Sequence, residues 1–98
     1  MEKKSKAIIF FIKYPQEGKV KTRLAETIGH KNAYMLYRLF VQDLLELLKK
    51  SKIPFFIFYS PSENEKDVKN WLGNRFNYIA QEGNDLGQRM KNAFNTLF

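Results

Sequence analysis

The sequence predicts an α/β domain, a three-layer α/β/α sandwich with a mainly parallel, Rossmann-like sheet. Three short apolar segments rich in β-branched and aromatic residues alternate with segments of helical period. This alternation is typical of parallel sheets that helices cover on both faces. We expect residues 1–98 to form a single domain, and because three strands make a small sheet, we expect the fold to be incomplete.

The predicted strands cover residues 6–13, 53–59 and 76–81. Residues 6–13 are apolar on both faces, which predicts a buried central strand of a parallel sheet. Pro54 is compatible with the second strand only near its start, because proline donates no backbone hydrogen bond.

Four helices are predicted between and after these strands. A short helix begins near Lys21 and ends at Gly29, where glycine adopts a left-handed cap conformation easily. Each of the other three has one apolar face. For the helix that ends at Lys49 and Lys50 this face contains Ala33, Leu36, Tyr37, Phe40, Leu44, Leu47 and Leu48. For the next helix, which ends at Gly73, it contains Val68, Trp71 and Leu72, and for residues 86–98 it contains Leu86, Met90, Ala93, Phe94 and Leu97.

The composition excludes several classes of protein. Cysteine is absent and histidine occurs once, which excludes disulfide scaffolds, thiolate zinc sites and histidine-cluster metal sites. No apolar run approaches the ~20 residues that span a bilayer. We therefore predict a cytoplasmic protein with no membrane partner.

The net charge of +7 is concentrated near the N-terminus. Residues 1–23 contain seven basic and two acidic residues, so most of the excess lies in this segment. A local excess of positive charge predicts an anionic ligand.

The first candidate site follows the first predicted strand, in residues 13–24. In open α/β sheets, ligands bind at the carboxyl ends of the strands. Gly18 allows a close approach of the backbone, Lys21 and Arg23 supply positive charge, and Thr22 supplies a hydroxyl. These are the parts of a phosphate-binding loop, although neither the Walker A pattern nor G-x-G-x-x-G is present. A basic surface loop explains the same residues equally well.

The second candidate site is the segment 83–90, after the third predicted strand. Asp85 is placed to cap the last helix, and Arg89 could pair with it one turn later. The functional alternative places both side chains at the carboxyl edge of the sheet, where they would contact a nucleotide.

Together, K-x-P-x-x-G-x-V-K-T-R-L and D-L-G-x-R-M resemble a bacterial and archaeal family, DUF2064, also described as glycosyltransferase-A-like or selenodomain-associated transferase. The resemblance covers residues 7–98 and implies the nucleotide-diphospho-sugar transferase (GT-A) fold. It implies that this chain is the N-terminal, nucleotide-binding half of a glycosyltransferase or nucleotidyltransferase. The residues it places around the nucleotide are Lys13, Gly18, Lys21 and Arg23 on the first loop, and Asp85, Gly87 and Arg89 on the second.

The sequence departs from the family pattern at three places. Gln88 stands where glutamate is usual, and Lys13 stands where arginine is common, which keeps the charge but loses the bidentate fork. The acidic G-x-D-x-P motif that holds Mg²⁺ or Mn²⁺ in this family is absent, and Asp85 is the only nearby carboxylate. We therefore predict no metal site in this chain and no catalytic activity of the chain alone.

Two other functions fit the composition. A small nucleic-acid-binding module would use the basic N-terminal segment as a phosphate clamp, although no RNP, KH or helix-turn-helix pattern occurs. A truncated, non-catalytic paralogue would bind no ligand. In each case an open sheet edge would favour a homo-oligomer.

Overall fold

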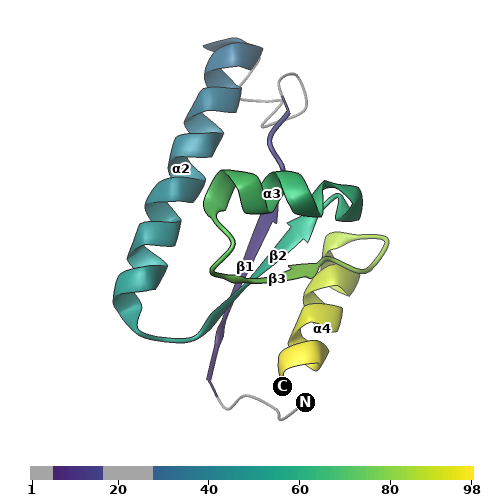
Figure 1. Ribbon diagram of the computed structural model, residues 1–98. Helices are drawn as coiled ribbons and strands as arrows, with labels where there is room; N and C mark the ends of the chain where they lie inside the picture. Colours follow the sequence, from purple (N-terminus) through teal and green to yellow (C-terminus); the bar gives the residue numbers. More distant parts are fainter. Residues whose placement is uncertain (1–5, 17–27) are drawn as a thin grey trace. The chain divides into compact units, whose positions relative to one another are not determined.

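The computed structural model describes residues 6–16 and 28–98 (Figure 1). Two compact units divide the chain, residues 15–51 and residues 1–14 with 52–98. The helices and strands, in chain order, are β1 (Ile8–Lys13), α2 (His30–Ser51), β2 (Phe55–Ser60), the 3₁₀ turn η1 (Ser62–Asn64), α3 (Glu65–Leu72), β3 (Asn77–Ala80) and α4 (Leu86–Leu97). The predicted order of strands and helices is confirmed over the described residues.

The three strands form a parallel sheet in the order β1-β2-β3. Phe11 of β1 lies beside Phe58 of β2, which lies beside Ile79 of β3. The prediction that the first strand is central is wrong for the described sheet, because β2 occupies that position. A continuous apolar run indicates that both faces of a strand are covered, and it does not give the position of the strand in the sheet.

One face of the sheet packs against α4. The buried core of this layer consists of Phe56 and Phe58 from β2 with Ala93 and Leu97 from α4. Around them lie partly buried apolar side chains: Ala7, Ile9, Phe11, Ile79 and Phe98. The rings of Phe11 and Phe58 lie 5.8 Å apart, so the aromatic residues of neighbouring strands are part of one core.

The opposite face of the sheet packs against α3 (Figure 1). Successive side chains of a strand point to opposite faces, so Tyr59 lies on the face that Phe58 does not use. The Tyr59 hydroxyl reaches Glu65 of α3, and Val68 of the same helix is fully buried. The three layers α3, sheet and α4 confirm the predicted α/β/α sandwich.

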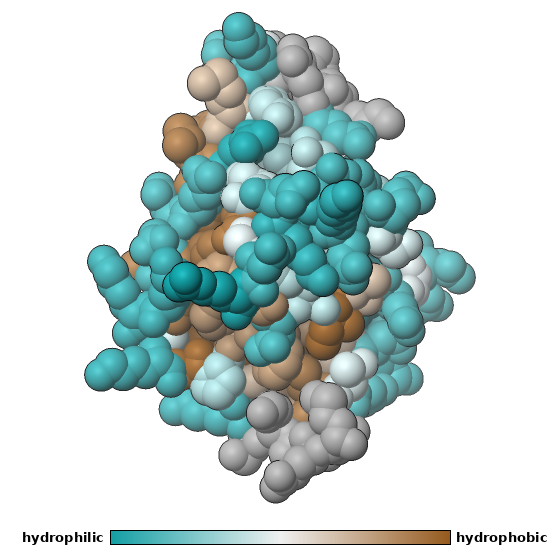
Figure 2. Space-filling model, viewed as in Figure 1, coloured by the Kyte–Doolittle hydropathy of each residue, from teal (hydrophilic) through white to brown (hydrophobic). Residues whose placement is uncertain are grey.

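The outward side of α3 is hydrophilic (Figure 2), where Glu65, Lys66, Asp67 and Asn70 are exposed. The helix ends at Gly73, whose φ of +111° and bond from its N–H to the Lys69 carbonyl close the last turn. The prediction of an amphipathic helix that ends at this glycine is confirmed.

In the unit of residues 15–51, α2 starts directly after Gly29, which has a φ of +90°. The left-handed conformation predicted for this glycine is confirmed. Most of the helix predicted to precede it lies outside the described residues. At the other end of α2, Lys49 and Lys50 occupy the last turn, where positive charge is favourable.

The apolar face predicted for α2 is partly wrong. Ala33, Val41 and Leu45 are buried, whereas Leu36, Phe40 and Leu47 are between 48% and 63% exposed. Apolar residues of α2 lie on several sides of the helix. Their three- and four-residue spacing therefore predicts a helix, but it does not predict which side is buried.

The apolar face predicted for α4 is also partly wrong. Ala93 and Leu97 are buried, whereas Leu86, Met90 and Phe94 are more than half exposed. Met90 and Phe94 line an apolar groove of about 320 Å³ together with Ile9 and Phe11 of β1. The outer edge of β1 has no strand partner among the described residues, and association through this edge stays a prediction.

Candidate functional site

The candidate site lies where the three parallel strands end. Lys13 of β1 lies beside Ser60 of β2, and Tyr59 lies beside Ala80 of β3. Two backbone bonds extend this edge, from the Tyr14 N–H to the Ser60 carbonyl at 2.8 Å and from the Gln81 N–H to the Tyr59 carbonyl at 2.9 Å. The chain leaving β3 is therefore held against β2 before it turns into α4.

Asp85 is the N-cap of α4. Its backbone is extended, with φ −144° and ψ 173°, and its Oδ1 accepts a 2.8 Å bond from the Gln88 N–H. Gln88 reaches back, and its Oε1 accepts a 2.8 Å bond from the Asn84 N–H. This reciprocal pair is close to a capping box, which confirms the structural role predicted for Asp85.

Arg89 points away from this cap toward the end of β3. Its Nε donates to the Gly83 carbonyl at 3.1 Å, and its Nη1 donates to the Gln81 Oε1 at 3.3 Å. The ion pair with Asp85 that the sequence suggested does not form. Both acceptors are neutral, and no carboxylate among the described residues pairs with Arg89. Arg89 thus has a half-buried guanidinium whose charge no carboxylate of residues 6–16 and 28–98 neutralises.

Gln81 connects Arg89 to the sheet. The Gln81 Nε2 donates to the Ile12 carbonyl of β1 at 2.9 Å and to the Phe58 carbonyl of β2 at 2.7 Å. One side chain therefore joins the ends of two strands to α4. Gln81 is not among the site residues that the sequence predicts. The signal that could have found it is a polar residue at the end of a predicted strand, on the edge where ligands bind.

Two glycines shape the segment between β3 and α4. Gly83 has a φ of +135°, and a Cβ added there would lie 2.8 Å from the Arg89 backbone nitrogen and 2.9 Å from the Gln88 Cβ. Gly87, predicted as a site residue, is exposed, and an added Cβ would lie 3.3 Å from the Asp85 Oδ1. Gly83 is therefore required by the fold of the loop, whereas a side chain at Gly87 would press on the Asp85 carboxylate that caps the helix.

The remaining predicted site residues belong to the first loop. Lys13 is the last residue of β1 and is exposed, so it lies on the same edge of the sheet as the end of β2. Gly18, Lys21, Thr22 and Arg23 lie outside the described residues. The prediction that they form a phosphate-binding loop therefore stays a prediction.

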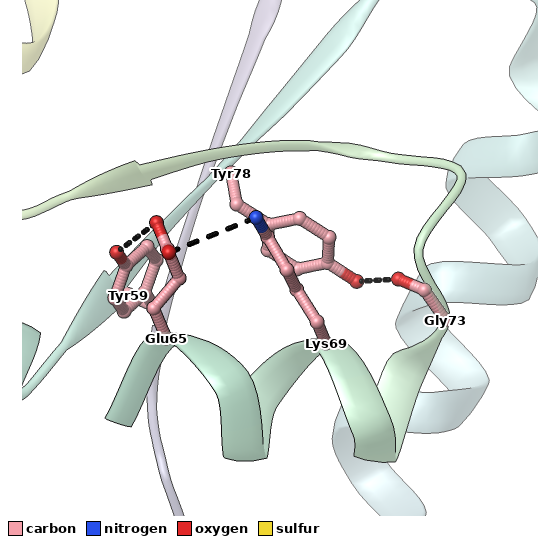
Figure 3. A network of polar contacts seen from close by, with 5 residues as sticks. All are labelled: Tyr59, Glu65, Lys69, Gly73 and Tyr78. Carbon is pink, nitrogen blue, oxygen red and sulfur yellow. Dashed lines mark hydrogen bonds and ion pairs between the residues drawn. The ribbon is translucent and has the colours of Figure 1, made fainter. Parts of the chain in front are cut away.

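Two tyrosines on the α3 face form a separate polar network (Figure 3). The Tyr59 hydroxyl donates to the Glu65 Oε1 at 3.0 Å, and the Tyr78 hydroxyl donates to the Gly73 carbonyl. Lys69 lies 3.8 Å from the Glu65 Oε2 and over the Tyr78 ring. Burial raises the pKa of Tyr78 to about 12, and burial together with Glu65 raises the pKa of Tyr59. Both phenols are neutral near pH 7, and their hydrogen bonds connect β2 and β3 to the two ends of α3.

Two further properties follow from the described part of the chain. It contains no group of three or more histidine, cysteine, aspartate or glutamate side chains that could hold a metal ion. Within the same residues, no helix combines the length and apolarity that crossing a bilayer requires.

The fold and this edge define an α/β protein with a candidate anion site at the carboxyl ends of parallel strands. Residues 43–98, more than half of the chain, match the model of the family described as "Uncharacterized protein conserved in bacteria (DUF2064)". The chain belongs to this family, as the two sequence motifs predicted.

The chain is also similar to a solved structure from Desulfovibrio desulfuricans G20, of a protein provisionally named a nucleotide-diphospho-sugar transferase. The two are 47% identical over 92% of this chain, with a TM-score of 0.87. This chain spans 40% of the length of that structure. No curated protein matches the chain. The comparison confirms the predicted α/β fold.

Proposed function

We propose that this chain is the nucleotide-binding part of an enzyme that transfers a glycosyl or nucleotidyl group from a diphosphate-bearing donor. The similarity to the Desulfovibrio protein supports a transferase role, and the position of Arg89 supports an anionic ligand. In open α/β sheets such ligands bind at the carboxyl ends of the strands, which is where Arg89 lies.

The observation that carries the proposal is the set of partners of Arg89, which donates to two neutral oxygens and pairs with no carboxylate of the described residues. A guanidinium is always charged near pH 7, and partial burial of an unneutralised charge costs free energy. A diphosphate bound at Nη2, which donates to none of the described residues, would remove that cost through charge-assisted hydrogen bonds. The neutral carbonyl oxygens of Gln81 and Gly83 fix the guanidinium and leave its charge available.

The basic segment near the N-terminus would complete the site. Lys13 is at the same edge of the sheet, and we propose that Gly18, Lys21, Thr22 and Arg23 contact the phosphates. Asp85 and Gly87 would border the nucleotide at the start of α4. In the whole enzyme, the basic side chains of Lys13, Lys21, Arg23 and Arg89 would also stabilise the negative charge that develops on the departing diphosphate or phosphate.

Mg²⁺ or Mn²⁺ would add further neutralisation of a diphosphate. The described residues do not fit such an ion, because they contain no cluster of carboxylates and the Asp85 Oδ1 is used by the helix cap. No step of the proposal uses a metal, and the activity that we assign to this chain is binding.

Isothermal titration calorimetry with UDP-glucose, GTP and CTP, each with and without Mg²⁺, tests the proposal. We expect saturable binding of at least one nucleotide, and we expect Lys21→Ala combined with Arg23→Ala to weaken it at least about tenfold. Failure of all three nucleotides to bind, or unchanged affinity of this double variant, contradicts the proposal.

Titration of single-stranded DNA and of mononucleotides at increasing salt concentration distinguishes this function from nucleic-acid binding. Binding to single-stranded DNA through the basic segment would weaken steeply with salt, because it depends on release of counterions. Phe56, Phe58 and Tyr59 are buried in the core, so these aromatic rings are not available to stack on bases. We therefore expect mononucleotide binding to persist at moderate salt and DNA binding to be absent.

A further inference from the structure

The polar contacts at the end of β3 point to a residue that acts on the ligand through Arg89. We propose that Gln81 is a positioning residue, which holds the Arg89 guanidinium toward the phosphates of the donor without neutralising its charge. This inference rests on the proposed function, because it assigns Arg89 to the binding of the diphosphate.

The orientation of the Gln81 amide is fixed by its partners. Its Nε2 lies within 2.9 Å of two main-chain carbonyl oxygens, those of Ile12 and Phe58. Carbonyl oxygens only accept hydrogen bonds, so the NH₂ end must face them. The Oε1 end is therefore directed to the Nη1 of Arg89, which only donates.

The anchor of this amide is rigid. The Gln81 N–H donates to the Tyr59 carbonyl at 2.9 Å, so the backbone and the side chain of Gln81 are both tied to β2. Arg89 receives a second acceptor from Gly83, whose position is restricted by its positive φ and close contacts. Two fixed acceptors hold Nε and Nη1, which defines the direction of Nη2.

Glutamine suits this role better than glutamate. A carboxylate at position 81 could not donate to the Ile12 and Phe58 carbonyls, and it would form an ion pair with Arg89. That pair would compensate the charge that the phosphates are proposed to bind. The neutral amide positions the guanidinium and preserves its attraction for an anion.

A double-mutant cycle between Gln81 and Arg89 tests the inference. The variants are Gln81→Glu, Arg89→Ala and both together, and the probes are inorganic pyrophosphate and the nucleotide that binds most tightly among UDP-glucose, GTP and CTP. We expect Gln81→Glu to weaken binding at least about tenfold in the wild-type background and less than about twofold in the Arg89→Ala background. Direct repulsion between a new carboxylate and the ligand would instead persist without Arg89.

Gln88→Glu is the matched control. It makes the same amide-to-carboxylate change nearby on the chain, and its new oxygen can still accept from the Asn84 N–H. We expect affinity within about threefold of the wild type, because this oxygen does not contact Arg89. Where Gln81→Glu fails to fold, as judged by circular dichroism and urea unfolding, Gln81→Met replaces it and removes the same hydrogen bonds without adding charge.

The outcomes are distinct. If the wild type binds and Arg89→Ala weakens binding, but both Gln81 variants bind like the wild type, the positioning role is wrong and the proposed function stands. Equal losses from Gln81→Glu in both backgrounds also overturn the positioning role. If the wild type binds neither pyrophosphate nor any nucleotide, the proposed function and this inference both fail.

Discussion

Asp85 and Arg89 lie four residues apart at the start of α4, and their side chains bind different partners. The Asp85 carboxylate accepts from the Gln88 N–H at 2.8 Å, while the Arg89 Nη1 donates to the Gln81 Oε1 at 3.3 Å. The Asp85 carboxylate is therefore used by the helix cap, and it does not neutralise Arg89 at the end of the sheet. This separation gives Asp85 a structural role as the helix cap and leaves the Arg89 charge available for the binding that we propose.

Removal of the cap should lower stability. Asp85→Ala removes the acceptor of the Gln88 N–H, and we expect the free energy of unfolding to fall by about 0.5–2 kcal/mol. Asp85→Ser keeps an oxygen at the N-cap and should stay within about 0.5 kcal/mol of the wild type. Urea unfolding of the three proteins measures this, and equal midpoints for Asp85→Ala and the wild type would exclude a capping role.

Alanine at Gly83 should be more damaging than alanine at Gly29. Both glycines have positive φ, but an added Cβ at Gly83 meets the Arg89 nitrogen at 2.8 Å, whereas no atom of the described residues lies within 4 Å of one at Gly29. Gly29→Ala carries only the backbone strain of about 1–2 kcal/mol. Gly83→Ala adds a steric clash and should cost more. Thermal unfolding compares the pair, and a smaller loss at Gly83 would contradict the described loop.

Replacement by alanine should lower the free energy of unfolding far more at Phe58 than at Phe94. Phe58 is 2% exposed and lies in the core between the sheet and α4, whereas Phe94 is 57% exposed. We expect Phe58→Ala to cost about 3–5 kcal/mol, which is a large part of the stability of a small domain. Phe94→Ala should cost much less. Circular dichroism during urea unfolding checks this, and similar losses would place the core elsewhere.

Tyr78 should make stability depend on pH in the alkaline range. Burial raises its pKa from 10.0 to about 12, so the folded protein keeps the phenolic proton where the unfolded chain loses it. The contribution of Tyr78 is fully present below about pH 10 and is lost as the pH rises toward 12. Tyr78→Phe removes this titration together with the bond to Gly73.

The measurement is urea unfolding of the wild type and Tyr78→Phe at several values between about pH 8 and pH 11. The stability advantage of the wild type over the variant should shrink as the pH rises. An advantage that grows with pH would contradict the direction of the pKa shift.

The sequence was sufficient to predict the parallel sheet, the strands and the end of each described helix. The alternation of apolar strands with helices determines these features, and Gly29 and Gly73 mark the helix boundaries as local rules require. The buried side of α2 was not predictable in the same way. Leu36 and Phe40 are as apolar as Val41 and Leu45, so only packing between elements separates them.

The candidate site was predictable in part. Asp85 and Arg89 were identified from a short motif, but their partners depend on how the chain turns after β3. The sequence did not predict Gln81 as a site residue, because its side chain contacts the carbonyl oxygens of Ile12 and Phe58, which are distant in sequence. A polar residue at the end of a predicted strand indicates the edge where ligands bind, but it does not show which strands the side chain joins.

The proposed function depends above all on Arg89, which we propose to bind the phosphates of a nucleotide donor. The most direct test compares Arg89→Ala with Arg75→Ala, because Arg75 is exposed just before β3, at the opposite end of that strand from Gln81. Both variants remove one positive charge. We expect Arg89→Ala to weaken the binding of inorganic pyrophosphate and UDP-glucose at least about tenfold, and Arg75→Ala to change it by less than about twofold. Equal affinities of the two variants for both ligands would contradict this expectation.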